Sequence, residues 1–245
     1  KVVFFVGCLL DKLFPETAKT IEAVLAHHGA NVMIPKNQGC CGIPMLAAGD
    51  QESFNRLVDH HIGLLNAEKF DYLVTGCATC TATIKKIWPS IAEIKSLPGK
   101  DALIRLAEKT YDISEFLVNV MGISPQQNSR NIQISKREAT YHDPCHLRKT
   151  LKIYKEPRLL IQASSKYQFK EMTEADACCG MGGSFNLRHY NTSTEIGLKK
   201  INSIKASGAT VVATGCPACM VQISDMMAKS KTSIDVRHVV EIYSD

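Results

Sequence analysis

Short apolar runs that end in glycine and cysteine recur along the chain. The run "VVFFVG" precedes Cys8, "YLVTG" precedes Cys77 and "VVATG" precedes Cys216. Their length and their β-branched and aromatic residues predict strands that are buried on both faces, as in a parallel sheet. The opening run ends after about ten residues, too short for a membrane span, and it lacks a signal-peptide cleavage pattern. No later run is longer, so no transmembrane segment is expected.

Apolar positions at helical spacing fill the gaps between these runs. The two clearest stripes are Ala18, Ile21, Leu25 and His28, ahead of Gly29, and Phe54, Leu57, Val58, Ile62 and Leu65. Helical patterns also cover about 101–109 and 114–121, whereas "WPSIAEIKSLPGK" and "MGISPQQNSRNIQISK" carry the Pro, Gly, Ser and Asn residues typical of loops. Strands that alternate with helices favour an α/β fold with parallel sheets and right-handed crossovers.

The cysteines indicate that the chain contains an internal duplication. The first thiol set is Cys8, Cys40, Cys41, Cys77 and Cys80, and the second thiol set is Cys145, Cys178, Cys179, Cys216 and Cys219. Cys145 follows Cys8 by 137 residues, Cys178 follows Cys40 by 138, and Cys216 follows Cys77 by 139. We therefore expect two tandem pseudo-repeats, 1–122 and 137–245, each a small, mostly parallel sheet flanked by helices. The cysteines are expected at the carboxyl ends of the strands.

The composition narrows the class of protein. A chain of 245 residues can bury a core without covalent staples, so ten cysteines point to metal or redox chemistry. The net charge of +5 is spread without a basic run and aromatic residues make up 7%, which argues against a nucleic-acid partner. A reducing, cytoplasmic location is the default for such a chain. The sequence begins at Lys1 rather than Met, which leaves an upstream segment open.

Each thiol set requires a cation if its thiolates converge, because their mutual repulsion would otherwise protonate or oxidise them. The neighbours Cys40 and Cys41, like Cys178 and Cys179, are poor disulfide partners, since a bridge between them strains the intervening peptide. Zinc needs four ligands, usually in two pairs, and each set has one C-x-x-C pair. Five thiols with a vicinal pair fit a polynuclear iron-sulfur cluster better.

Two alternatives for the cysteines stay open. One is a zinc site in each repeat, and the other is a thiol-disulfide enzyme that uses Cys77 and Cys80 but leaves the CCG segments unexplained. His142 and His146 flank Cys145 and invite a mixed His/Cys site. Because Cys145 already occupies the position of Cys8, we expect these histidines to donate hydrogen bonds behind the ligands or to pack.

The segments "VGC…QGCCG…TGCATC" and "DPCH…ACCG…TGCPAC" resemble the cysteine-rich CCG repeats of heterodisulfide reductase. They are also similar to the iron-sulfur subunits of lactate-utilisation proteins, glycolate oxidase and anaerobic glycerol-3-phosphate dehydrogenase. The resemblance covers almost the whole chain. It implies a 4Fe-4S cluster, noncubane in the heterodisulfide reductase branch, bound by each thiol set, with zinc in one repeat as a minor alternative. The ferredoxin motifs that precede the repeats in many dehydrogenase relatives do not occur here. The chain is therefore expected to be a piece of a longer protein, a stand-alone subunit, or one served by a separate ferredoxin-like protein.

The leading hypothesis is a cytoplasmic electron-transfer subunit between a flavoprotein dehydrogenase, of the lactate, glycolate or glycerol-3-phosphate type, and a downstream acceptor. A flavoprotein or a ferredoxin-type iron-sulfur subunit is the expected partner, and that partner could bring the chain to a membrane surface. The first alternative is a heterodisulfide reductase-type catalytic subunit that cleaves a disulfide at its cluster. The second is a zinc-binding structural protein. No Gly-x-Gly-x-x-Gly motif for a dinucleotide occurs in the sequence.

Overall fold

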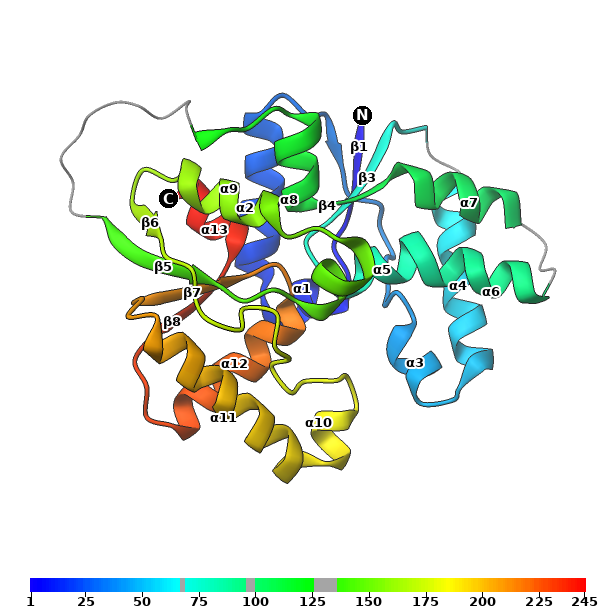
Figure 1. Cartoon of the computed structure of the whole chain (residues 1–245). Coiled ribbons are helices and arrows are strands. Elements are labelled where there is room, and N and C mark those ends of the chain that lie inside the picture. Colours follow the sequence, from blue (N-terminus) through cyan, green and yellow to red (C-terminus); the bar gives the residue numbers. More distant parts are fainter. Residues whose placement is uncertain (67–68, 96–99, 126–135) are drawn as a thin grey trace. The chain divides into compact units, whose positions relative to one another are not determined.

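The computed structural model describes residues 1–66, 69–95, 100–125 and 136–245. They form two compact units, Lys1–Ile113 and Ser114–Asp245 (Figure 1). Within the described residues, each unit has a four-stranded parallel sheet. The first sheet comprises β1 (Val2–Phe5), β2 (Val32–Met33), β3 (Tyr72–Thr75) and β4 (Thr110–Asp112). The second comprises β5 (Arg137–Tyr141), β6 (Tyr167–Phe169), β7 (Val211–Thr214) and β8 (Asp235–His238).

The two sheets have the same topology. Their strand orders are β2-β1-β3-β4 and β6-β5-β7-β8, so in each repeat the second strand lies outside the first, and the third and fourth follow on the other side. The central strands β1 and β7 are buried along their whole length. Parallel strands covered by helices on both faces require such continuous apolar sequence. The predicted α/β fold of two tandem repeats is confirmed.

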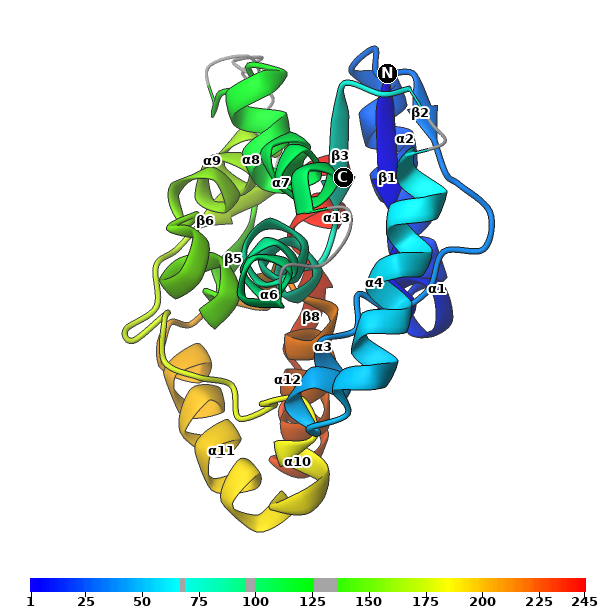
Figure 2. The same cartoon turned by 90° about the vertical axis from the view of Figure 1, so that its right-hand side faces the viewer.

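The helices of the first unit bury the predicted apolar stripes. Ile21 and Leu25 are buried on α2, and Phe54 and Val58 on α4. Helices α6 and α7 lie side by side (Figure 2). The elements are α1 (Cys8–Leu13), α2 (Pro15–His27), α3 (Ile43–Ala47), α4 (Gln51–Asn66), α5 (Ala78–Ala82), the π-helix η1 (Thr83–Ile87), α6 (Trp88–Lys95), α7 (Lys100–Lys109) and α8 (Ile113–Glu115), which reaches into the second unit.

One loop prediction in this unit is wrong. The segment "WPSIAEIK" forms helix α6, which continues without a break from α5 and the π-helix η1. The wider π-helical turn lies directly before Pro89, whose missing backbone N–H cannot complete a regular α-helical hydrogen bond. Trp88 at the start of this helix is buried in the core. The remainder of the predicted loop, 96–99, lies outside the described residues.

The second unit repeats this arrangement with different helix lengths. Residues 114–125 belong to it, whereas residues 126–135 of the predicted boundary region at about 122–136 lie outside the described residues. The repeat limits at 122 and 137 stay predictions. Its further helices in the described residues are the π-helices η2 (Phe116–Val120) and η4 (His146–Leu151), together with α9 (Lys155–Ala163), α10 (Phe185–Arg188), α11 (Tyr190–Ala206), α12 (Pro217–Lys229) and α13 (Val239–Ser244). Among the helices that the structure describes in either unit, none has the length and apolar character of a membrane span.

Candidate metal centres

Four cysteines stand where a strand ends and a helix begins. Cys8 is the first residue of α1 after β1, and Cys77 caps α5 after β3. In the second unit, Cys145 caps η4 after β5 and Cys216 caps α12 after β7. The unsatisfied N–H groups and the dipole of a helix N-terminus favour a thiolate over a thiol. The structure places these cysteines at the carboxyl ends of the strands, as predicted.

Each CCG segment forms the same turn. Cys40 and Cys41 lie between β2 and α3, and the second segment lies between β6 and α10. The backbone N–H of Gly42 points at the Sγ of Cys40, 3.5 Å away, and the N–H of Gly180 points at the Sγ of Cys178, 3.3 Å away. The turn therefore supplies two adjacent thiols and one backbone donor to a sulfur. This arrangement suits a thiolate that binds metal.

The glycine of this turn is required on two counts. Gly42 has a φ of 91° and Gly180 a φ of 95°, in the left-handed region that other residues rarely adopt. A Cβ at Gly42 would lie 2.8 Å from the Phe54 ring, and one at Gly180 would lie 2.5 Å from the backbone oxygen of Ser193. The order Cys-Cys-Gly is thus set by the backbone as well as by the ligands.

The structure brings each thiol set together. In the first, side-chain hydrogen bonds link Cys8 to Cys40, Cys40 to Cys41, Cys41 to Cys80 and Cys80 to Cys77. No disulfide involves any of the ten cysteines, all of which lie in the described part of the chain. The structure therefore gathers these five thiols without a bridge between any two of them, and their role as metal ligands stays a prediction.

The second thiol set is gathered in the same way but opens further to solvent. Cys179 is linked by side-chain hydrogen bonds to Cys178 and Cys219, and Cys219 is linked to Cys216. Cys145 interacts electrostatically with Cys216 and Cys179. Cys145 and Cys178 are exposed, whereas the other three are buried. One edge of this set is therefore accessible from the surface.

Crowding drives the thiol pKa values apart. Hydrogen bonds from Cys41 and Cys8 lower the pKa of Cys40 to about 2. The hydrogen bond between Cys40 and Cys41 raises the pKa of Cys41 to about 12. Hydrogen bonds to Cys41 and Cys77, together with burial, raise the pKa of Cys80 well above its usual range. The first set can thus ionise readily at one position, and further ionisation needs a cation.

In the second set the thiol that ionises most readily is Cys179. Hydrogen bonds from Cys178 and Cys219 are the largest causes of its lowered pKa, and His142 adds to the effect. The pKa of Cys178 is raised in turn, first by its hydrogen bond to Cys179 and then by burial. In each repeat, hydrogen bonds between neighbouring thiols therefore lower the pKa of one cysteine of the turn and raise the pKa of the other.

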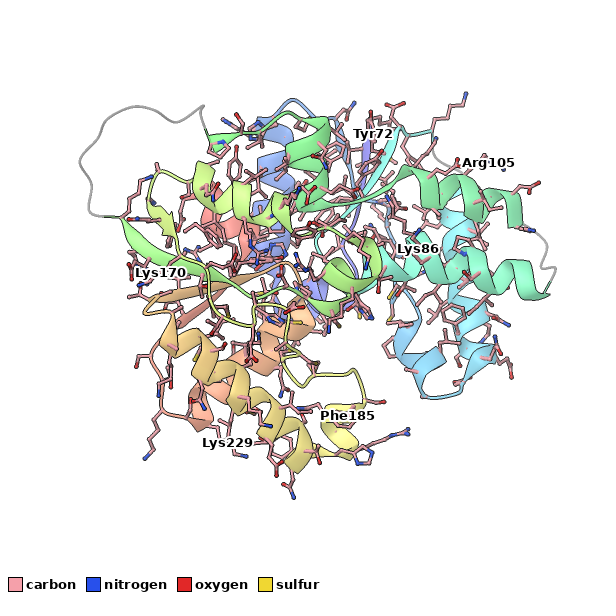
Figure 3. All side chains as sticks on the ribbon, in the orientation of Figure 1. Tyr72, Lys86, Arg105, Lys170, Phe185 and Lys229 are labelled. Atoms are coloured by element: carbon pink, nitrogen blue, oxygen red, sulfur yellow. The ribbon has the colours of Figure 1, made fainter. Side chains whose placement is uncertain are left out.

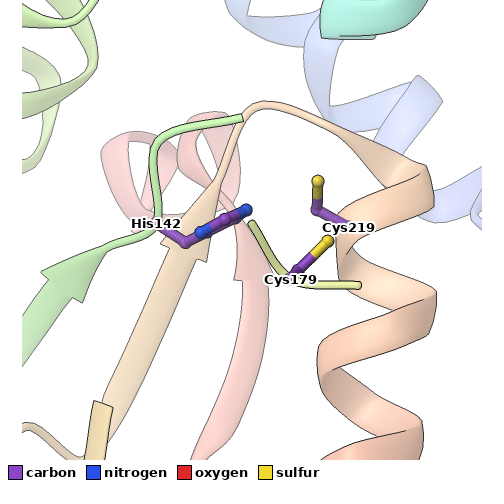
Figure 4. Close-up of side chains that lie close together, drawn as sticks. All are labelled: His142, Cys179 and Cys219. Carbon is purple, nitrogen blue, oxygen red and sulfur yellow. The ribbon is translucent and has the colours of Figure 1, made fainter. Parts of the chain in front are cut away.

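His142 belongs to this second site. Its side chain is 1% exposed, and its donor nitrogen and the Sγ atoms of Cys179 and Cys219 all lie within 4.8 Å of one another (Figure 4). His146 begins η4 and is only partly buried. Both histidines flank Cys145 in the sequence, but in the structure only His142 belongs to this three-residue group.

His61 supports the first CCG turn and was not singled out from the sequence. Its Nε2 accepts a hydrogen bond from the N–H of Gly39 at 3.1 Å, so its Nδ1 carries the proton and donates to the Leu57 oxygen at 2.7 Å. The ring stacks on Trp88 with a centroid distance of 5.7 Å, and the Trp88 indole donates to the Cys41 oxygen at 2.9 Å. Burial lowers the pKa of His61, which keeps the ring neutral. The sequence feature that could have identified His61 is its helical spacing from the buried residues Phe54, Val58 and Leu65 of α4.

In the second unit a buried lysine supports the segment that leads to the CCG turn. Lys200 on α11 is 2% exposed, and its Nζ donates to the backbone oxygens of Glu174 and Ala175 at 2.5 and 3.3 Å. Burial lowers its pKa. These two hydrogen bonds attach the segment before the second CCG turn to helix α11.

We expect Lys200→Met to destabilise the protein by about 2 kcal/mol, because one buried and one part-buried carbonyl oxygen lose a charged donor. The neighbouring Lys199 is exposed, so Lys199→Met should change the free energy of unfolding by less than about 0.5 kcal/mol. Anaerobic urea unfolding followed by circular dichroism measures both. Equal effects of the two substitutions would show that Lys200 does not hold this segment.

The comparisons with known proteins cover both repeats. Residues 2–85 and 139–224 match the family described as a cysteine-rich domain, CCG. The chain is 36% identical over 229 residues to an uncharacterized iron-sulfur protein of Methanococcus maripaludis and 31% identical over 251 residues to a fumarate reductase (CoM/CoB) subunit of Methanothermobacter marburgensis. It is 28% identical over 242 residues to lactate utilization protein A 2 of Bacillus cereus.

The share of each relative that is covered differs. The matches take in 94%, 100% and 99% of this chain, in that order. The chain spans 42% and 47% of the two archaeal relatives, about half their length, and 97% of the Bacillus protein. The two family matches together include more than half of the chain, and each contains one complete thiol set. This chain therefore belongs to the family of cysteine-rich CCG domain proteins.

Proposed function

We propose that the chain is an iron-sulfur electron-transfer subunit that passes electrons between a flavoprotein dehydrogenase, of the lactate, glycolate or glycerol-3-phosphate type, and a downstream acceptor. The observation that carries this proposal is the gathering of all ten cysteines into two unbridged sets of five. Relatives whose names describe iron-sulfur, fumarate reductase and lactate utilization proteins support it. Because the proposed clusters need reduced cysteines, a location in the reducing cytoplasm is part of the proposal.

The donor sets fit an iron-sulfur cluster better than a zinc ion. A zinc ion is satisfied by four ligands and would leave one thiol of each set without a role, whereas a polynuclear cluster can use vicinal thiolates on different irons. Such a cluster supplies one-electron steps. The residues of this chain would bind it through the thiolates, donate backbone N–H bonds from Gly42 and Gly180 to cysteine sulfurs, and exclude water by burying Cys41, Cys80 and Cys219.

A partner is part of the proposal because oxidation of a hydroxy acid or alcohol is a two-electron reaction that a flavin performs. The exposed edge of the second thiol set, Cys145 and Cys178, gives a route for electrons at the surface. Beside it, α10 follows the CCG turn with Leu187 84% exposed and the half-buried Phe185 at its start (Figure 3). An exposed leucine beside a half-buried phenylalanine, next to the proposed redox site, fits a docking surface for a protein partner.

The proposal is tested by electron transfer to the loaded chain. The anaerobically purified protein is mixed with the flavoprotein encoded beside it and with L-lactate, glycolate or glycerol 3-phosphate, and bleaching of the cluster absorbance is recorded. We expect substrate-dependent bleaching and co-purification of the two proteins. If each adjacent flavoprotein turns over its substrate without reducing the clusters, the electron-transfer proposal is wrong.

A second candidate is reduction of a disulfide at the second thiol set. Its support is the exposure of Cys145 and Cys178, together with the relative named as a fumarate reductase (CoM/CoB) subunit. A disulfide takes up two electrons and two protons and yields two thiols, so the clusters would deliver the electrons one at a time from the partner. Reoxidation of the dithionite-reduced chain by a disulfide, with release of two thiols per disulfide, would favour this candidate. No reoxidation by the disulfide would count against it.

A further inference from the structure

We propose that His142 is a metal ligand of the second site, so that this site binds its cluster through cysteine and histidine while the first binds through cysteine alone. The inference rests on the proposed iron-sulfur function. It concerns one residue whose type and position the thiol pattern does not explain, since the second set is already complete without it.

The first observation is an imidazole with no other role. His142 is 1% exposed, and among the described residues neither ring nitrogen has a hydrogen-bond partner apart from the Cys179 sulfur. A buried polar group left without partners costs free energy, and native structures rarely keep one unless a water or an ion completes it. The group that would complete this one lies toward the thiols.

The second observation is the distance between donors. The imidazole nitrogen and the Sγ atoms of Cys179 and Cys219 lie within 4.8 Å of one another (Figure 4). Two donors on one metal ion stand roughly 3.5–4 Å apart, given metal–sulfur bonds of about 2.3 Å and metal–nitrogen bonds of about 2.1 Å. A small rotation of the side chains therefore brings all three onto one ion.

The third observation is that the backbone at His142 is held from several directions. The N–H of His142 donates to the Ala213 oxygen at 2.9 Å, and the N–H of Asp143 donates to the Ala175 oxygen at 3.0 Å. The Arg158 guanidinium donates two hydrogen bonds to the Asp143 carboxylate, at 2.8 and 3.0 Å. A ligand held in this way reaches its metal without loss of further conformational freedom.

The repeat itself supplies the comparison. Alignment of Cys145 with Cys8 places His142 opposite Phe5, which packs against His61 with a ring-centroid distance of 5.2 Å and has no ligand atom. The imidazole therefore adds a ligand to the second site without adding negative charge. A thiolate at the same position would add negative charge and lower the reduction potential of the centre.

The test compares three variants of the full chain loaded under anaerobic conditions. His142→Phe copies the first repeat and removes the ligand, His142→Cys replaces it with a thiol, and His146→Phe changes the neighbouring histidine as a control. Iron and sulfide per chain, an optical redox titration and an anomalous map at the iron edge are measured for each that folds.

We expect the parent to show an iron atom within about 2.3 Å of a His142 nitrogen. His142→Phe should lose part of the iron of the second site, His142→Cys should keep the iron but lower the potential of that site, and His146→Phe should match the parent. Unchanged iron and potential in His142→Phe, or a parent map with no iron within about 3 Å of the imidazole, overturns the inference. Absence of iron and sulfide from the parent would instead refute the proposed function. In that case a zinc edge map decides whether His142 is still a ligand.

Discussion

Replacement of Cys179 by serine is expected to remove about half of the iron and acid-labile sulfide while leaving the first site loaded. Cys179 is buried at the centre of the second thiol set, in contact with Cys178 and Cys219. A hydroxyl is a far poorer ligand for iron than a thiolate, so the second cluster should be lost or reduced to a smaller species. The first set keeps its own five cysteines, and electron flow should stop if the clusters act in series.

The reciprocal change, Cys41→Ser, is the matched control, since Cys41 is equally buried in the first turn. It should spare the second cluster and remove the first. Iron and sulfide analysis, with circular dichroism to confirm folding, distinguishes the two variants by which spectroscopic signal each retains. Loss of all iron from either folded variant would mean that the two sets share one cluster.

Gly180→Ala is expected to destabilise the protein by about 3 kcal/mol. A left-handed backbone costs a residue with a side chain about 1–2 kcal/mol, and the new Cβ would stand 2.5 Å from the Ser193 oxygen, which α11 cannot easily move. Displacement of this turn also moves the Gly180 N–H away from the Cys178 sulfur, so the second site should bind less iron.

The control for this change lies in the same loop. Gly183 also has a positive φ, of 60°, but a Cβ there would meet nothing within 4 Å, so Gly183→Ala should cost about 1 kcal/mol and keep the iron. Anaerobic thermal unfolding and iron analysis of both variants make the comparison. A Gly180→Ala protein with the stability and iron content of Gly183→Ala would show that the turn tolerates a side chain.

Much of this fold could be predicted because the duplication repeats each signal. The runs before Cys77 and Cys216 are both buried parallel strands that lead into a helix, and either occurrence alone would have been a weaker prediction. Likewise, two CCG segments at matching positions predicted one site per repeat, and the structure gathers both thiol sets. A repeated pattern supports a structural prediction more strongly than a single one, because both copies must be compatible with the same backbone conformation.

The remaining features depend on tertiary contacts that a linear pattern does not contain. The Trp-Pro pair at the start of α6 is typical of a loop by composition, but the π-helix η1 carries helical backbone directly into it and Trp88 is buried. His61 and Lys200 reach carbonyl or N–H groups far away in sequence, at Gly39 and Ala175. Neither role was predicted from the sequence, because the partners of both side chains are set by how the loops pack.

Metal and sulfide analysis of the anaerobically purified parent protein tests the central claim, that each thiol set binds its own iron-sulfur cluster. The account predicts a brown protein with acid-labile sulfide and, for two four-iron clusters, about eight iron atoms per chain. Cysteines that lose their cluster in air can oxidise, so oxygen must be excluded throughout. A colourless, folded protein with stoichiometric zinc and no sulfide would contradict the account.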